Sequence, residues 1–145
     1  MEPVMTAAEL TGFMLREFPQ VADDYRVERL TADGLVLRFA TGARHLRPGG
    51  TVSGPAMFAL ADVAFYLALI ARIGPVALAV TTSAAIDFLR KPAAGTDLLA
   101  EVRLLKLGRS LAVGDVLVFS EGRAEPVTRA SLTYSIPPAR PSAAA

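Results

Sequence analysis

Residues 49–72 read GGTVSGPAMFALADVAFYLALIAR, and this stretch decides how the chain folds. Glycine and proline crowd its start, and from residue 56 to residue 71 every side chain except Asp62 is apolar or aromatic. A helix that is hydrophobic on all sides lies either in the core of a protein or in a membrane. Pro55 suits the first helical turn, where its missing N–H costs nothing, and Ser53 suits the N-cap position.

The length and the single acid of this helix favour a protein core over a membrane. A spanning helix needs about 20 consecutive apolar residues, and the run here is shorter. An ionised carboxylate near its middle would cost several kcal/mol in lipid. The rest of the chain contains strand patterns that can wrap such a helix. We therefore predict a buried core helix and no membrane-spanning segment.

The composition of the whole chain narrows the class of protein. Its 145 residues suit one domain. The 15 Lys+Arg nearly balance the 14 Asp+Glu, so the chain lacks the excess of positive charge that is typical of proteins that bind nucleic acid or an anionic membrane surface. The absence of Cys and the single His exclude a disulfide scaffold and a thiolate or multi-His metal site. No signal-peptide pattern is evident, so we expect a cytoplasmic protein. The hydrophobic content of 52% indicates that part of the surface is buried between subunits.

An amphipathic helix and six strand patterns accompany the central helix. Residues 6–18 are predicted to be helical, because Thr6 and Glu9 have the capping-box spacing. Residues 41–50 are predicted to be a loop, and residues 137–145 (PPARPSAAA) a disordered tail after a single domain over residues 1–136. The strand patterns occupy residues 25–30, 35–40, 76–90, 98–107, 111–119 and 127–136.

The order of these elements indicates an α+β fold. Strand 76–90 alternates between an apolar face and a face of small or polar side chains. This strand and the three that follow are joined by short turns, so we expect them to be antiparallel neighbours. A curved antiparallel β-sheet wrapped around the long central helix satisfies the pattern. The sheet edges would be exposed in a monomer, and pairing with a second subunit is expected.

Four segments resemble one known family over about residues 10–136. They are HLRPGGTVSGP (45–55), FALADVA (58–64), AIDFLRKP (85–92) and KLGRS (106–110). The chain resembles the hot-dog-fold acyl-CoA thioesterases, specifically their phenylacetate-pathway-type group. In that family a G-x-x-H-G-G motif precedes the central helix, and an acid on the helix performs the chemistry. Asp62 matches the acid, and Gly54 matches the first glycine of the pair, whose backbone N–H serves as an oxyanion donor.

The chain departs from the family pattern at three positions. Ser53 stands where the family has His, and Pro55, which has no N–H, replaces the second glycine. Arg47 aligns with a loop position that is often Asn. These departures weaken the inference of efficient hydrolysis more than they weaken the inference of the fold.

Four residues are candidates for the chemistry. A carboxylate in a core helix must be paired, hydrogen-bonded or neutral, so Asp62 is either a general base or nucleophile, or a structural acid bonded to a loop N–H or an arginine. Gly54 either offers an oxyanion-binding N–H or only shapes a turn. Ser53 orients water or substrate, or caps the helix. Thr81 aligns with a water- or substrate-orienting hydroxyl of relatives, or is an ordinary strand residue, and His45 is more typical of a solvated loop side chain.

A second group of residues is predicted to hold the substrate. By resemblance, cations at turns bind the phosphates and pantetheine arm of CoA, often from a neighbouring subunit, although turn cations commonly only face solvent. Arg47 could instead meet an acyl carboxylate. The apolar candidates suggest an aryl or medium-chain acyl group, unless their side chains belong to the core. The candidates are Arg47, Arg90, Lys91, Lys106 and Arg109 among the cations, and Met57, Phe58 and Phe65 among the apolar residues.

The leading hypothesis is hydrolysis of an acyl-CoA thioester by a homodimer or a homotetramer of two dimers. By resemblance, the site lies between subunits and needs no metal or cofactor beyond the CoA thioester substrate. A non-catalytic acyl-CoA binding or assembly protein of the same fold is the alternative. A hot-dog dehydratase ranks third, because it would rely on a His and only His45 is available. The sequence does not identify the acyl group of the substrate or say whether the carrier is CoA or acyl-carrier protein. It also leaves open whether Asp62 acts as a general base or as a nucleophile.

Overall fold

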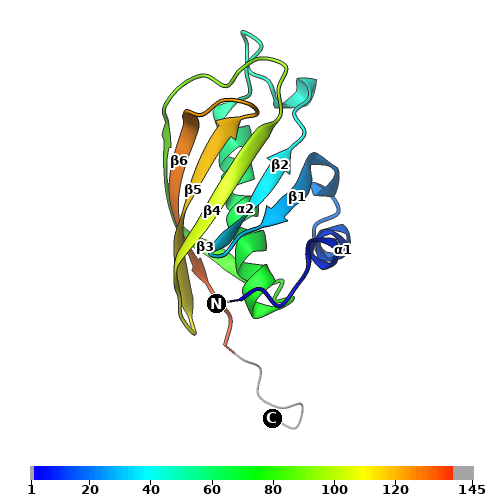
Figure 1. The fold of residues 1–145 in the computed structure, drawn as a ribbon, viewed down its shortest axis with the longest axis vertical. Helices are drawn as coiled ribbons and strands as arrows, with labels where there is room; N and C mark the ends of the chain where they lie inside the picture. The colour runs from blue at the N-terminus through cyan, green and yellow to red at the C-terminus, as the bar shows by residue number, and fades with distance from the viewer. Residues whose placement is uncertain (1, 139–145) are drawn as a thin grey trace.

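The computed structural model describes residues 2–138 and contains two α-helices and one sheet of six antiparallel strands (Figure 1). The helices are α1 (Ala7–Glu17) and α2 (Gly54–Ile73). The strands are β1 (Tyr25–Leu30), β2 (Gly34–Phe39), β3 (Val80–Phe88), β4 (Leu98–Leu107), β5 (Leu111–Ser120) and β6 (Pro126–Ser135). Short 3-10 turns cover Ala22–Asp24 and Ala43–His45. Of the predicted disordered tail, residues 139–145 lie outside the described residues.

Helix α2 is the core around which the sheet curves (Figure 1). Most of its side chains are buried, among them Leu60, Phe65 and Leu67, which have no exposed surface. It is long and apolar enough to cross a membrane, but 67% of its apolar window is buried inside the domain. The predicted core helix is therefore confirmed. A long central helix wrapped by a curved antiparallel sheet is the hot-dog fold expected from the resemblance.

The strand order corrects one prediction. The order is β1-β2-β4-β5-β6-β3, so β4, β5 and β6 are neighbours as expected, but β3 pairs with β6 and not with β4. Residues 89–97 carry the chain from one edge of the sheet to its middle and are too long to act as a hairpin turn. They are anchored on the way: the Leu89 N–H donates to Val127 O, and the Thr41 hydroxyl donates to Thr96 O.

Strand β3 is also shorter than predicted. Residues 76–79 form a turn, in which the Val76 N–H donates to Gly74 O and the Ala79 N–H donates to Val76 O. The Tyr66 hydroxyl holds this turn against α2 through a 2.9 Å hydrogen bond to Ala77 O. The register with β6 then shifts between Thr81 and Ser83, which breaks the even alternation that the sequence suggested.

The outer edge of β3 is not paired within the described chain. Seven of its nine residues are exposed, and its large apolar side chains Val80 and Phe88 are 54% and 51% exposed. Asp87 is its one charged residue. A long edge strand with so little charge is a template for pairing with another strand.

Gly114 makes the close approach of β4, β5 and α2 possible. A Cβ atom at Gly114 would lie 2.4 Å from Arg103 O and 2.8 Å from Cε2 of Phe65. The Phe65 ring fills this space and stacks on the Tyr134 ring, with the ring centroids 5.1 Å apart. Gly114 therefore fixes how deep Phe65 sits, and through Phe65 it supports Tyr134.

We predict that Gly114→Ala lowers the free energy of unfolding by about 2 to 3 kcal/mol, because a backbone oxygen and a core ring must both move. Gly12→Ala is the matched control, since its Cβ would be 3.4 Å from a flexible Arg16 atom and alanine favours a helix. Urea unfolding followed by circular dichroism measures both variants. Equal stability of Gly114→Ala and the wild type would contradict the packing argument.

Candidate functional site

Asp62, the acid of α2, lies at the centre of a hydrogen-bonded cluster. Its Oδ1 accepts a 2.6 Å hydrogen bond from the Thr81 hydroxyl and a 2.8 Å hydrogen bond from the Tyr134 hydroxyl. Thr81 on β3 and Tyr134 on β6 are direct cross-strand partners, so both side chains leave the sheet on the same face, towards α2. Among residues 2–138, the partners of this half-buried carboxylate are thus two hydroxyl groups, and not the loop N–H or arginine of the structural alternative.

Tyr134 is held as a hydrogen-bond donor. It is 3% exposed, and its hydroxyl oxygen also lies 3.2 Å from the backbone carbonyl oxygen of Asp62. Burial first, and then the negative charge of Asp62, raise the pKa of the Tyr134 hydroxyl above its usual value. The phenol therefore stays protonated throughout the working range of pH.

A pocket of about 380 Å³ opens beside Asp62. Its wall combines the carboxylate with aromatic and aliphatic side chains from α2 and from the C-cap of α1, including Phe18, Val63 and Tyr66. Glu17 and Gln20 add polar groups, and within the described chain no arginine, lysine or histidine lines it. The pocket is suited to an uncharged, largely apolar group placed next to a carboxylate.

The first turn of α2 offers one free backbone donor. The Ser53 hydroxyl accepts a 3.2 Å hydrogen bond from the Ala56 N–H, so Ser53 is the N-cap of the helix. Pro55 has no N–H, and the Met57 N–H donates to Ser53 O. Among residues 2–138 no acceptor engages the Gly54 N–H, which stands at the positive end of the helix dipole.

Several predicted binding residues meet in a groove beside this helix start. The groove has a volume of about 340 Å³, and its lining includes Arg47, Gly54, Met57, Arg90 and Lys91. The guanidinium of Arg90 donates to Pro126 O and lies 3.9 Å from the Glu125 carboxylate. The groove therefore places three cationic side chains beside the free N–H of Gly54.

The two halves of the candidate site are separate within one chain. Gly54 belongs to the groove and Asp62 to the other pocket, and no residue lines both. They are eight residues apart on one helix, which corresponds to about 12 Å. A thioester carbonyl cannot contact the N–H and the carboxylate of the same chain at once.

The remaining predicted residues lie outside both pockets. Phe65 is fully buried in the core, and Phe58 is 38% exposed. Arg109 lies between β4 and β5. His45 accepts a 2.8 Å hydrogen bond from the Gly42 N–H at Nδ1, and its Nε2 is 3.5 Å from the Asp24 carboxylate. His45 is thus a loop anchor and not the solvated side chain expected from the sequence.

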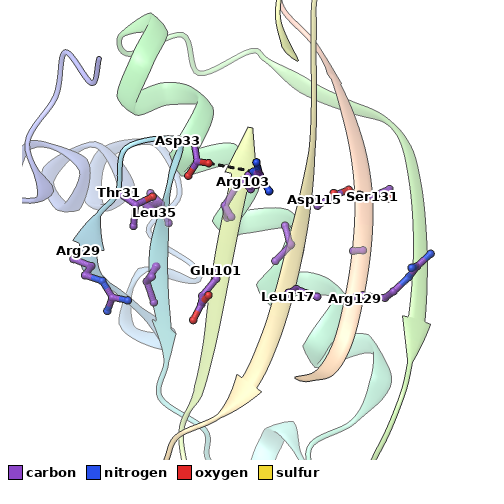
Figure 2. Close-up of a pocket in the computed structure, with 14 residues that line it drawn as sticks. Arg29, Thr31, Asp33, Leu35, Glu101, Arg103, Asp115, Leu117, Arg129 and Ser131 are labelled. Atoms are coloured by element: carbon purple, nitrogen blue, oxygen red, sulfur yellow. Dashed lines mark hydrogen bonds and ion pairs between the residues drawn. The ribbon is translucent and has the colours of Figure 1, made fainter. Parts of the chain in front are cut away.

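A pocket of about 500 Å³ on the outer face of the sheet contains none of the predicted residues. Figure 2 shows its labelled side chains on the strands and on the turn between β1 and β2, where Asp33 pairs with Arg103 across 3.2 Å. Glu101 and Leu117 are cross-strand partners, and Leu117 pairs in turn with Arg129. Acids, arginines and apolar residues thus alternate here, in contrast to the two pockets on the helix side.

Sequence reasoning missed Tyr134, although a weak signal was present. Its strand places Thr128, Ala130, Leu132 and Tyr134 on the inward face, so Thr128 and Tyr134 are the inward side chains there with a polar group. A buried tyrosine hydroxyl generally finds a hydrogen-bond partner. The partner could not be identified, because it depends on the pairing of β3 with β6.

Comparison with known proteins gives a consistent result. A family model for the thioesterase superfamily matches residues 49–127. A candidate thioesterase from Silicibacter sp. TM1040 is 53% identical, with a TM-score of 0.89 over 95% of this chain and 96% of that chain. A mutant of the phenylacetic acid degradation protein PaaI from Thermus thermophilus is 31% identical, with a TM-score of 0.70 over 82% and 99% of the two chains.

A more distant solved structure shares the fold. It is a hypothetical thioesterase protein with coenzyme A from Streptococcus pneumoniae TIGR4, 20% identical, with a TM-score of 0.75 over 91% of this chain and 99% of that chain. A search of functionally curated proteins finds no match. The family match covers more than half of the chain and includes Gly54 and Asp62. The chain therefore belongs to the thioesterase superfamily of hot-dog-fold proteins and is similar to the phenylacetic acid degradation protein PaaI.

Proposed function

We propose that the protein hydrolyses an acyl-CoA thioester in the cytoplasm. The observation that carries this proposal is the Asp62 carboxylate, which opens into a pocket and is held there by two hydroxyl donors. An acid in this position can remove a proton from water while the water oxygen adds to the thioester carbonyl carbon. When the tetrahedral intermediate collapses, the carbon–sulfur bond breaks and the proton passes from Asp62 to the CoA sulfur. The products are a carboxylic acid and free CoA.

The same carboxylate could instead attack the carbonyl carbon and expel CoA. The resulting mixed anhydride would then be hydrolysed by water, which restores the carboxylate and yields the same acid. In both routes negative charge develops on the carbonyl oxygen. The Gly54 N–H is the proposed donor to that oxygen, and removal of one such donor typically costs about 10²- to 10³-fold in kcat.

The proposed active unit contains two chains. Because Gly54 and Asp62 of one helix are about 12 Å apart, the carbonyl must sit between the Asp62 of one chain and the Gly54 of another. The exposed edge of β3 is the natural place for the second copy, since Thr81 lies on this strand and its Phe88 ring lies next to Gly54. A homodimer, or a tetramer of two such dimers, follows from this arrangement.

The groove beside Gly54 is the proposed site of the CoA phosphates. Arg47, Arg90 and Lys91 supply positive charge there, and the resemblance places phosphate-binding residues at such turns. The solved S. pneumoniae relative contains coenzyme A, which supports a CoA ligand for this fold. The acyl group would enter the pocket beside Asp62, where Phe18, Val63 and Tyr66 favour an aryl or medium-chain group.

A non-catalytic acyl-CoA binding or assembly protein is the second candidate. The observation that favours it lies at the start of α2, where Ser53 is occupied as the N-cap and Pro55 offers no N–H. A single donor then remains for the oxyanion. Such a protein would bind acyl-CoA and release no thiol.

We predict that the wild type releases free thiol from an aryl- or medium-chain acyl-CoA, and that Asp62→Asn lowers kcat by about a hundredfold or more. The amide keeps the shape of the carboxylate but can neither accept the proton nor attack. Thiol release is measured with a chromogenic reagent, and circular dichroism and sedimentation confirm that both proteins are folded and assembled. Undiminished turnover by Asp62→Asn would show that Asp62 does not perform the chemistry. Saturable binding of acyl-CoA without turnover in the wild type would favour the non-catalytic binding protein.

The two-chain site predicts subunit complementation. Gly54→Pro removes the N–H, and the extended backbone of Ser53 is compatible with a following proline. Gly54→Pro and Asp62→Asn are each expected to be inactive. When they are unfolded together and refolded, heterodimers contain one intact site, so about a quarter of the wild-type activity should return. Each variant refolded alone is the control, and a mixture that stays inactive while sedimentation shows heterodimers would contradict the arrangement.

A further inference from the structure

We infer that Tyr134 is a positioning residue for Asp62: together with Thr81 it holds Oδ1 of the carboxylate, so that Oδ2 is the oxygen that meets water or the thioester. This inference rests on the proposed function for its catalytic meaning. It gives Thr81 a different role from the one that the resemblance implies. The hydroxyl of Thr81 is directed to the carboxylate and not to water or substrate.

The arrangement of donors carries the inference. Thr81 Oγ1 and the Tyr134 hydroxyl lie 2.6 Å and 2.8 Å from the same oxygen, Oδ1. Within residues 2–138, no hydrogen bond to Oδ2 is present. Two donors on one oxygen fix the plane of the carboxylate and draw its charge towards that oxygen. The other oxygen keeps its lone pairs free, beside the pocket.

The surroundings of Tyr134 make it a rigid support. Its ring stacks on Phe65, which is fully buried, and lies 6.1 Å from the Tyr66 ring. Thr81 is its cross-strand partner, so a movement of either donor would disturb the β3–β6 pairing. The carboxylate is therefore oriented by the sheet and not only by its own helix.

The titratable groups around Asp62 come from four elements. Tyr134 lies on β6, Tyr66 on α2 and Glu17 at the end of α1. Tyr25 lies on β1, and besides burial the charge of Asp62 raises its pKa. Tyr134 is the one among them that donates a hydrogen bond to the carboxylate. Removal of the Tyr134 hydroxyl therefore takes one donor from Oδ1 and leaves the other titratable neighbours in place.

Tyr134→Phe tests the inference, because it removes the hydroxyl and keeps the ring that stacks on Phe65. We expect kcat to fall about tenfold to a hundredfold, with KM changed by less than about twofold. Thr81→Val, which removes the other donor, should also lower kcat and leave KM within about twofold of the wild-type value.

Tyr25→Phe is the matched control. It removes the hydroxyl of another partly buried tyrosine that makes no hydrogen bond to Asp62 and lines neither helix-side pocket. Its kcat and its KM should equal those of the wild type. An unchanged kcat in folded Tyr134→Phe, or an equal fall of kcat in Tyr25→Phe, would overturn the positioning role.

A second measurement does not depend on turnover. In protein labelled with ¹³C at the aspartate carboxyl carbons, the Asp62 signal is recorded at one fixed pH and assigned through Asp62→Asn. Its chemical shift should differ between Tyr134→Phe and the wild type, because a hydrogen-bond donor to Oδ1 is lost, and should be the same in Tyr25→Phe and the wild type. Equal chemical shifts in Tyr134→Phe and the wild type would overturn the inference. A changed chemical shift in Tyr134→Phe, together with a wild type that hydrolyses no acyl-CoA, would uphold the hydrogen-bond arrangement and reject only the proposed hydrolysis.

Discussion

The burial of one apolar helix is the constraint on which the rest of the structure depends. Helix α2 (Gly54–Ile73) has apolar side chains on all sides, so most of its surface must be enclosed. A single flat sheet can cover only one face of a helix. The sheet of six strands therefore curves around it, and β3 is carried to the far edge beside β6 to extend the cover. The strand order that contradicted the sequence prediction is a direct consequence of this need.

The same constraint creates the candidate site. A carboxylate on a helix of this kind cannot be left without partners, because an unpaired polar group away from water is costly. Thr81 and Tyr134 supply hydroxyl donors without adding a positive charge. An arginine in their place would have formed a closed ion pair with the acid. Two neutral donors keep the acid in place and leave it free to react.

The sequence predicted local features well and long-range features poorly. The capping box of Thr6 and Glu9, the N-cap Ser53 and the central helix all depend on neighbours a few residues away, and the structure confirms them. The bounds of β4 were also correct. The position of β3 and the role of Tyr134 depend on β3–β6 contacts between residues that are about 50 positions apart, which no periodicity encodes. The turn over residues 76–79 was missed because its apolar alternation is that of a strand, and the Tyr66 hydroxyl that holds it lies on α2.

The apolar surface of α2 also sets a condition on how the protein is made. The helix ends at residue 73, whereas β4, β5 and β6, which cover it, end only at residue 135. At roughly 5 to 20 residues per second, the ribosome needs roughly 3 to 12 seconds to complete these strands after the helix. During this interval the nascent chain presents a segment with the length and hydropathy of a membrane span. The apolar surface of α2 therefore stays without its full cover until the last strand has been made.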